Sequence, residues 1–251
     1  MVEIGISGGS TIRALILGFA AVLSLAAAAP AAAGRLIEPA LRIADGGSQG
    51  PQVALTLDAC SGLVDHRILD ELIADGIPAT IFVTGRWLKG NADAFRLMLA
   101  HPELFEIEDH GENHLPAVIG TERPYGLEPA GTAEAVAKEV LNGRADIARA
   151  GGGEVTWFRG ATALYSPDAI ELIASLGLRI AGFSLNGDLG ASVGEKAALA
   201  RMLTARDGDV IIAHINQPKR PAGAGVAEGI RQLKAHGFRF VRLRDATVSG
   251  G

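Results

Sequence analysis

The stretch VALTLDACSGLVDHRILDELIADGIPATIFVT, residues 53–84, contains the first unit of the pattern on which the fold depends. It begins with a short apolar run that ends at Asp58. A predicted helix over residues 65–75 follows, with its apolar side chains on one stripe. The β-branched run at residues 79–84 predicts a second strand. Strand, helix and strand in this order indicate two parallel strands joined by a crossover helix.

The same alternation continues to residue 243. Further strands are predicted at 104–108, 155–158, 178–185, 209–213 and 238–243, and further helices at 87–101, 132–150, 166–177, 195–206 and 226–235. This alternation predicts an α/β fold, for which an open doubly wound sheet and a closed or nearly closed barrel are both compatible. We favour a single distorted (β/α) barrel of about seven parallel strands, similar to a TIM barrel, because polar residues after the strands resemble parts of one site.

Residues 1–33 differ from the rest of the chain. Arg13 precedes an apolar run at residues 14–29, and small residues follow it. The run is shorter than the roughly 20 residues that a membrane-spanning helix needs, and it ends like a cleavable export signal. We therefore expect a signal peptide at residues 1–33 and a catalytic domain at residues 34–251. We also expect export to the periplasm or the cell exterior, with no stable membrane insertion; an uncleaved anchor is the alternative.

The composition is that of a globular protein, with 48% hydrophobic and 20% charged residues and a net charge of −5. No long basic run is present, so nucleic acid is not an expected partner. Cys60 is the only cysteine, which excludes an internal disulfide. Because it follows a strand, we expect it to be a small packed residue, with a reactive thiol as the alternative. Nothing in the sequence indicates an oligomeric state.

Two histidines, His110 and His114, follow the predicted strand at 104–108 and lie four positions apart. On the first turn of a helix, positions i and i+4 share a face, so both imidazoles can reach one point. Two convergent imidazoles suit a divalent metal such as zinc. The alternative is a polar loop that merely ends a strand.

Charged or titratable residues follow five of the predicted strands. They are Asp58, His110 with His114, Arg159, Asp188 and His214. In a barrel of parallel strands these strand ends meet at one face, where catalytic groups gather.

This set can be assigned roles in the hydrolysis of an amide or ester. A metal on the two histidines polarises a carbonyl and acidifies its bound water. Asp58 takes the proton from that water, and His214 protonates the leaving group. Arg159 keeps Asp58 ionised, and Asp188 orients and charges His214.

The same residues resemble the motifs of the polysaccharide deacetylases, carbohydrate esterase family four, with their nodulation-protein-B-like domain. The resemblance covers most of residues 53–241. The matching segments are Thr56-Leu57-Asp58, His110 to His114, Trp157-Phe158-Arg159, Asp188 and Ile212-Ala213-His214. It implies a distorted (β/α) barrel and metal-dependent removal of acetyl groups from N-acetylated sugars, as in cell-wall glycan or exopolysaccharide. It also implies that Asp58 is the base, His110 and His114 are metal ligands, and His214 is the acid.

One position departs from this resemblance. The family's first motif usually carries two adjacent aspartates, the second being the third metal ligand, and here Ala59 stands in its place. Three explanations are open: Asp65 replaces the missing ligand, Asp58 itself binds the metal, or two histidines and waters hold the metal weakly. We favour Asp65, although it is equally suited to cap the helix that begins at His66. The expected metal is Zn²⁺, and iron or other divalent ions also fit.

Two other functions are compatible with the sequence. One is a carbohydrate-binding protein that kept the barrel and lost turnover, and the other is an esterase that removes O-acetyl groups. An acid, a base and a partner for each favour an enzyme, because a binding protein has no use for them. The expected partner is therefore an acetylated glycan substrate.

Overall fold

The computed structural model describes residues 35–44 and 50–250, so the predicted signal peptide lies outside the described residues. These described residues belong to one compact unit. In the described part of the chain, no helix has both the length and the apolar character that a membrane span requires.

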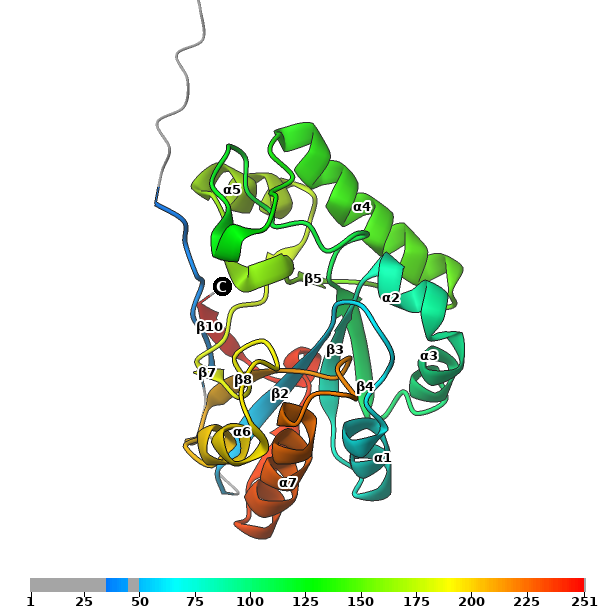
Figure 1. Cartoon of the computed structure of the whole chain (residues 1–251), viewed down its shortest axis with the longest axis vertical. Helices are drawn as coiled ribbons and strands as arrows, with labels where there is room; N and C mark the ends of the chain where they lie inside the picture. The colour runs from blue at the N-terminus through cyan, green and yellow to red at the C-terminus, as the bar shows by residue number, and fades with distance from the viewer. Residues whose placement is uncertain (1–34, 45–49, 251) are drawn as a thin grey trace, which may run out of the picture. The chain divides into compact units, whose positions relative to one another are not determined.

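A curled sheet forms the centre of this unit (Figure 1). Its strands are β1 Leu41–Ile43, β2 Gln52–Ala59, β3 Ala79–Val83, β4 Phe105–Asp109, β5 Trp157–Phe158, β6 Arg179–Ile180, β7 Leu185–Asn186, β8 Asp209–His214, β9 Arg239–Val241 and β10 Val248–Gly250. The order is β10-β1-β8-β2-β3-β4-β5-β6, with β7 beside β8 and β9 beside β2. Strands β2 to β9 pair in parallel, and β1 pairs antiparallel with β8 and β10. This arrangement confirms the expected α/β fold, a distorted partial barrel.

The segment that leads into β1 brings the two ends of the sheet together. The N–H of Phe183, beyond β6, donates to the Pro39 carbonyl at 3.3 Å, and the Leu41 N–H donates to the Phe183 carbonyl at 3.4 Å. Gly182 permits this approach, because a Cβ there would lie 2.1 Å from the Pro39 oxygen. Strands β1 and β10 were not predicted, since three residues each are too few to show a readable alternation.

Helices surround the sheet (Figure 1). They are α1 His66–Ala74, α2 Gly85–Gly90, α3 Ala92–Leu99, α4 Ala133–Arg149, α5 Pro167–Ser175, α6 Glu195–Met202 and α7 Ala222–Ala235, with 3₁₀ turns at Pro124–Gly126, Ala161–Ala163 and Leu243–Asp245. The prediction of one helix over residues 87–101 was wrong, because the helix is interrupted at Asn91. The Asn91 amide donates to the Gly62 and Trp87 carbonyls, and its oxygen accepts from the Val64 N–H.

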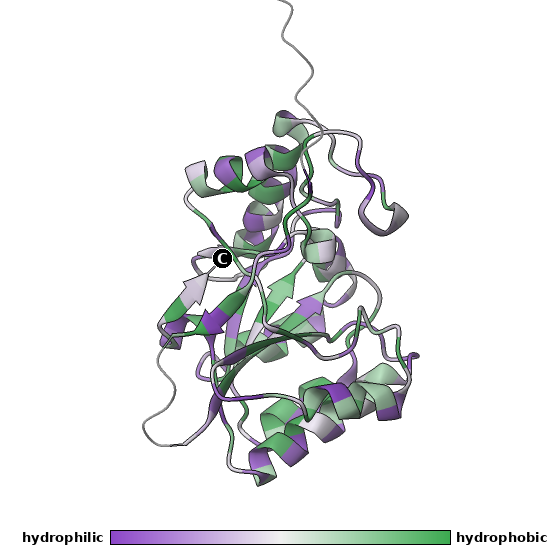
Figure 2. Ribbon diagram, turned by 90° about the vertical axis from the view of Figure 1, so that its left-hand side faces the viewer, coloured by the Kyte–Doolittle hydropathy of each residue, from purple (hydrophilic) through white to green (hydrophobic). Residues whose placement is uncertain are grey.

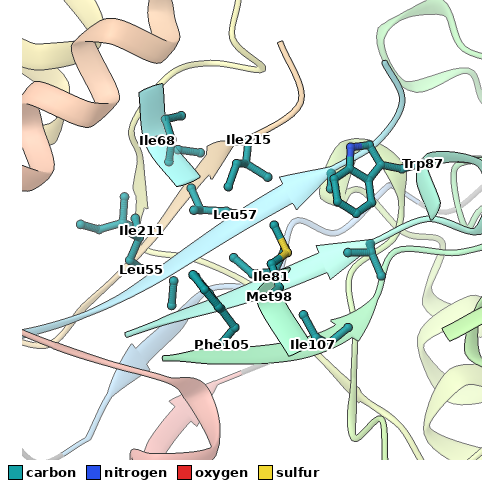
Figure 3. Close-up of a cluster of buried hydrophobic side chains, with 14 of the residues drawn as sticks. Leu55, Leu57, Ile68, Ile81, Trp87, Met98, Phe105, Ile107, Ile211 and Ile215 are labelled. Atoms are coloured by element: carbon teal, nitrogen blue, oxygen red, sulfur yellow. The ribbon is translucent and has the colours of Figure 1, made fainter. Parts of the chain in front are cut away.

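The main hydrophobic core lies between the sheet and the helices. Figure 3 shows strand side chains such as Leu55 and Leu57 in one cluster with Ile68 of α1 and Trp87 of α2, all of them buried. Figure 2 shows hydrophobic residues gathered in the central strands, whereas the helices carry residues of both kinds. Successive side chains of a strand point to opposite faces, so the residues that alternate with these leucines face the barrel interior. Ala54 accordingly belongs to a second, interior cluster.

Carboxyl groups are also buried inside the barrel, on β4. Glu108 accepts hydrogen bonds from the N–H groups of Thr156 and Trp157, at 2.9 and 2.8 Å. These hydrogen bonds lower the pKa of Glu108, but burial and the nearby charge of Glu106 outweigh them and raise the pKa to about 8. Glu108 is therefore mostly protonated at neutral pH and joins β4 to β5, the strand that precedes Arg159.

Candidate active site

Asp58 and His214 lie side by side at the carboxyl ends of two neighbouring parallel strands. The register of β2 and β8 makes them direct partners. Along β2, Leu57 and Ala59 face the main core, so Asp58 between them faces the interior of the barrel. The Asp58 carboxylate is buried there, with 3% of the residue exposed.

Arg159 is the buried partner of Asp58. Its Nη1 donates to Asp58 Oδ1 and to Thr56 Oγ1, both at 2.9 Å. Its Nε and Nη2 donate to the carbonyls of Ala181 and Gly182, at 3.0 and 3.1 Å. The guanidinium is fully buried, and these bonds hold it in one orientation against the carboxylate.

The surroundings of Asp58 favour its charged form. Burial raises the pKa of this carboxyl, but the charge of Arg159, followed by those of His110 and His214, outweighs burial and lowers the pKa below its ordinary value. Asp58 is therefore an ionised carboxylate at neutral pH, as a group that accepts a proton must be.

His214 has its own buried carboxylate partner. Its Nδ1 donates to Asp188 Oδ1 at 3.0 Å, and its backbone N–H donates to Asp188 Oδ2 at 2.8 Å. Burial lowers the pKa of the imidazole, but the charge and hydrogen bond of Asp188 outweigh this effect and raise it well above its ordinary value. His214 therefore carries a proton, and 15% of its side chain is exposed to receive a substrate.

His110 and His114 converge, although not in the way that their spacing suggests. Their ring centroids lie 4.9 Å apart, edge to face. The prediction that they share the first turn of a helix was wrong: His110 follows β4 directly, and His114 lies in an irregular loop with φ of 64°. A left-handed conformation is unfavourable for a residue with a side chain, and such strain is concentrated at functional sites.

Glu139 of α4 holds the loop that carries His114. Its Oε1 accepts from the N–H groups of Asn113 and Leu115, at 2.8 and 3.0 Å, one on each side of the histidine. Gly111 permits the approach, because a Cβ there would lie 2.5 Å from Glu139 Oε1. Glu139 is therefore a positioning residue for His114.

Cys60 lies among the imidazoles. It is buried, as expected, but its Sγ is 3.4 Å from His110 Nε2 rather than within the apolar core. Burial raises the pKa of the thiol. The charge of His110 and the hydrogen bonds to His110, His114 and His214 outweigh burial, so the pKa of Cys60 lies well below its ordinary value. Among the described residues, Cys60, His110 and His114 form a group whose ligand atoms all lie within 4.8 Å of one another.

Asp65 does not belong to this group. It is the N-cap of α1, where its Oδ1 accepts from the Arg67 N–H at 3.1 Å and from Arg67 Nε at 2.8 Å. Its second oxygen also binds Arg67, and 1% of the residue is exposed. The geometry thus favours the helix-capping interpretation over the hypothesis that Asp65 replaces the missing metal ligand.

Comparison with known proteins identifies the family. The profile of the polysaccharide deacetylase family matches residues 45–181, more than half of the chain. The chain belongs to the polysaccharide deacetylase family. No curated protein sequence matches it significantly.

Solved structures with the same fold include several carbohydrate esterases of family four. A pseudoenzyme from Bacillus anthracis is 17% identical, with a TM-score of 0.65 over 82% of this chain and 67% of that chain. The esterase PdaA from Bacillus subtilis is 21% identical, with a TM-score of 0.63 over 80% and 82%. An acetyl xylan esterase from Clostridium thermocellum, in complex with a cobalt ion, is 25% identical, with a TM-score of 0.63 over 77% and 89%.

Family membership places this deacetylase among hydrolases that act on the acetyl amide bonds of polysaccharides. The structure brings together all but one of the residues predicted from the sequence. Those brought together are Asp58, His110, His114, Arg159, Asp188 and His214.

Two further residues of this deacetylase were missed. Cys60 follows Asp58 by two positions, and side chains two positions apart in an extended chain point to the same face. This spacing could have predicted that Cys60 faces the site together with Asp58. Glu139 lies in a helix of ordinary composition, and nothing in the sequence distinguishes it.

Proposed function

We propose that this chain is an exported, divalent-metal-dependent hydrolase that removes acetyl groups from the amino sugars of an acetylated polysaccharide. The observation that carries the proposal is the adjacency of Asp58 and His214, each bound to a buried partner of opposite charge. Hydrolysis of an acetyl amide needs a base for water, an acid for the departing amine, and positive charge at the carbonyl oxygen.

Asp58 acts as the general base. The Arg159 guanidinium keeps Asp58 ionised through a hydrogen bond to Oδ1. The second oxygen, Oδ2, does not take part in that bond and lies 3.9 Å from His110 Nε2. A water between Asp58 and the histidines can therefore lose its proton to Oδ2 as it attacks the acetyl carbon.

His214 acts as the general acid. The Asp188 carboxylate binds Nδ1, so Nε2 is the nitrogen that donates its proton. An amine leaves an acetyl group only when it gains a proton, whereas an alcohol leaves more readily. A protonated His214 therefore meets the requirement that an N-acetyl substrate imposes.

The residues beside this pair fit a divalent cation. Two imidazoles and a thiol, with a carboxylate 3.9 Å from one imidazole, form a donor set suited to zinc or a similar ion. His110 Nδ1 donates to the Arg159 carbonyl at 2.5 Å, so its Nε2 is the nitrogen that faces the group. When bound, such an ion supplies the positive charge that polarises the acetyl carbonyl.

A second candidate function is carbohydrate binding without turnover. Ala59, where the resemblance expects a metal-binding aspartate, favours this candidate, as does the likeness to a protein described as a pseudoenzyme. Against it, a binding protein would gain nothing from two buried ion pairs that set the charges of Asp58 and His214.

Acetate release from N-acetylglucosamine oligomers tests these alternatives. We expect release that a chelator abolishes and added divalent metal restores. His214→Asn should lower the rate by about 10²- to 10⁴-fold, whereas the matched control His66→Asn, at an exposed histidine of α1, should leave it unchanged. Oligomer binding in calorimetry without acetate release, from either N-acetyl or O-acetyl substrates, would instead establish the binding protein.

Export is part of the proposal and is supported by the composition of residues 1–33. Expression of the full chain followed by cell fractionation tests it. We expect a product in the periplasm or medium whose N-terminus lies near Gly34. Retention of the intact chain in the cytoplasm would contradict export without affecting the assignment of the chemistry.

A further inference from the structure

We propose that Cys60 is a metal ligand of this site, so that the cation is held by one thiolate and two imidazoles. This inference rests on the proposed function, and it identifies the ligand that Ala59 cannot supply. It also predicts which metals the chain accepts.

The direction of the side chains at the end of β2 supports the assignment. β2 stays regular through Ala59, whose side chain is fully buried in the main core. Two residues apart in an extended chain, Asp58 and Cys60 share the opposite face. The Thr84 hydroxyl donates to the Cys60 carbonyl at 2.6 Å and fixes the backbone there. The ligand position is thereby shifted by one residue along the chain.

The separation of the donor atoms matches a tetrahedral site. Zinc binds sulfur at about 2.3 Å and imidazole nitrogen at about 2.0 Å, which places two such ligand atoms about 3.5 Å apart. Cys60 Sγ lies 3.4 Å from His110 Nε2, and the ligand atom of His114 completes a group within 4.8 Å. The three atoms therefore need little movement to share one ion.

The groups around these ligands hold them in place before an ion arrives. The Arg159 carbonyl accepts from His110 Nδ1, and Glu139 binds the chain on both sides of His114. Such outer partners orient metal ligands and strengthen binding. Of the two carboxylates considered as replacement ligands, Asp65 is already bound through both oxygens to Arg67, and Asp58 is bound through one oxygen to Arg159.

The proposed donor set predicts a metal preference. Thiolate and imidazole favour zinc and cobalt(II), whereas magnesium, calcium and manganese prefer oxygen ligands. A site built from one carboxylate and two imidazoles would accept the harder ions more readily. The chain should therefore retain zinc or cobalt(II) in competition with an excess of magnesium or manganese.

Cobalt(II) spectroscopy of the purified full chain tests the proposal without relying on turnover. After chelation and reloading, the wild-type protein should bind one cobalt(II) and show the near-ultraviolet charge-transfer band that a thiolate ligand produces. Cys60→Ser should lose this band and weaken cobalt(II) binding by at least about 100-fold, because loss of outer partners alone costs about 10- to 100-fold. The matched control Asp65→Asn, which keeps an N-cap oxygen, should retain both the band and the affinity.

The outcomes separate this proposal from the proposed function. A wild-type cobalt(II) complex without the thiolate band overturns the ligand role of Cys60, even if acetate is released, and this result needs no variant to fold. The band without acetate release supports the ligand role and removes the deacetylase function. If the chelated chain releases acetate and mass spectrometry finds acetyl on Cys60, the thiol is a nucleophile and the ligand role is overturned.

Discussion

Replacing Arg159 by methionine tests whether its guanidinium stabilises both the carboxylate of Asp58 and the barrel interior. Methionine is long and apolar and fills much of the same space. The substitution removes the donor to Asp58 and leaves the Thr56 hydroxyl and the carbonyls of Ala181 and Gly182 without that partner. All of this occurs around a fully buried side chain, where water cannot replace the lost bonds.

The expected loss of stability follows from these contacts. A hydrogen bond to a charged group contributes about 1.5–3 kcal/mol, and each neutral acceptor left without a donor costs about 1 kcal/mol. With one charged acceptor and three neutral ones, we therefore expect the free energy of unfolding to fall by about 4.5–6 kcal/mol, slightly more than the about 3–5 kcal/mol typical of a broken buried ion pair.

A double-mutant cycle isolates the charge interaction. Asp58→Asn removes the negative charge, so combining it with Arg159→Met leaves no unpaired buried carboxylate. The double variant should be more stable than the sum of the single losses predicts, by about 2 kcal/mol or more. Urea unfolding at pH 7, followed by circular dichroism, measures each variant. Losses that add to within about 0.5 kcal/mol would refute the reasoning.

A conservative variant keeps the test decisive if Arg159→Met does not fold. Arg159→Lys retains the positive charge and loses the planar arrangement of donors that reaches four acceptors at once. We expect it to be destabilised by about half as much as the methionine variant, because the bond to a charged group is the largest single contribution. The same cycle with Asp58→Asn then reports the coupling.

Three further predictions concern other buried groups. The wild-type free energy of unfolding should fall as pH rises from 4.5 to about 8, because the folded state keeps on Glu108 a proton that the unfolded state releases. Glu108→Gln, compared with wild type by urea unfolding across that range, should remove a pH-dependent decrease in the free energy of unfolding on the order of 5 kcal/mol. Glu139→Ala should weaken zinc binding by about 10- to 100-fold in competition titrations, whereas Glu139→Gln, which keeps an oxygen at the His114 loop, should lose less. Asp188→Asn should lower the pKa of His214 in NMR titration and shift the alkaline limb of acetate release to lower pH, and an unchanged pKa would contradict the role of Asp188.

The residues that follow the strands could be predicted from the sequence because the fold is regular there. Asp58, Arg159 and His214 each come directly after an apolar run, and parallel strands bring their carboxyl ends to one face. Their partnerships also follow from charge, since a buried carboxylate requires a cation and a protonated imidazole benefits from an anion.

The arrangement of the loops could not be predicted in this way. The spacing of His110 and His114 fits a helical turn, but the chain instead forms a loop that a distant glutamate on α4 holds. That contact spans the chain from residue 113 to residue 139 and leaves no local pattern. The break at Asn91 has the same origin, because its side chain bonds to residues that precede β3.

Cys60 shows how a substitution can preserve a site while moving a ligand. In a regular strand, two adjacent side chains point to opposite faces, because the side-chain period is two. Since β2 remains regular through Ala59, whose side chain packs in the apolar core, the next residue, Cys60, is the one that faces the site. A thiol at that residue reaches His110 with no change in the rest of the constellation, so Asp58, Arg159, Asp188 and His214 keep their partners. The cobalt(II) band therefore decides whether Cys60 takes the ligand role that the family motif gives to the aspartate replaced here by Ala59.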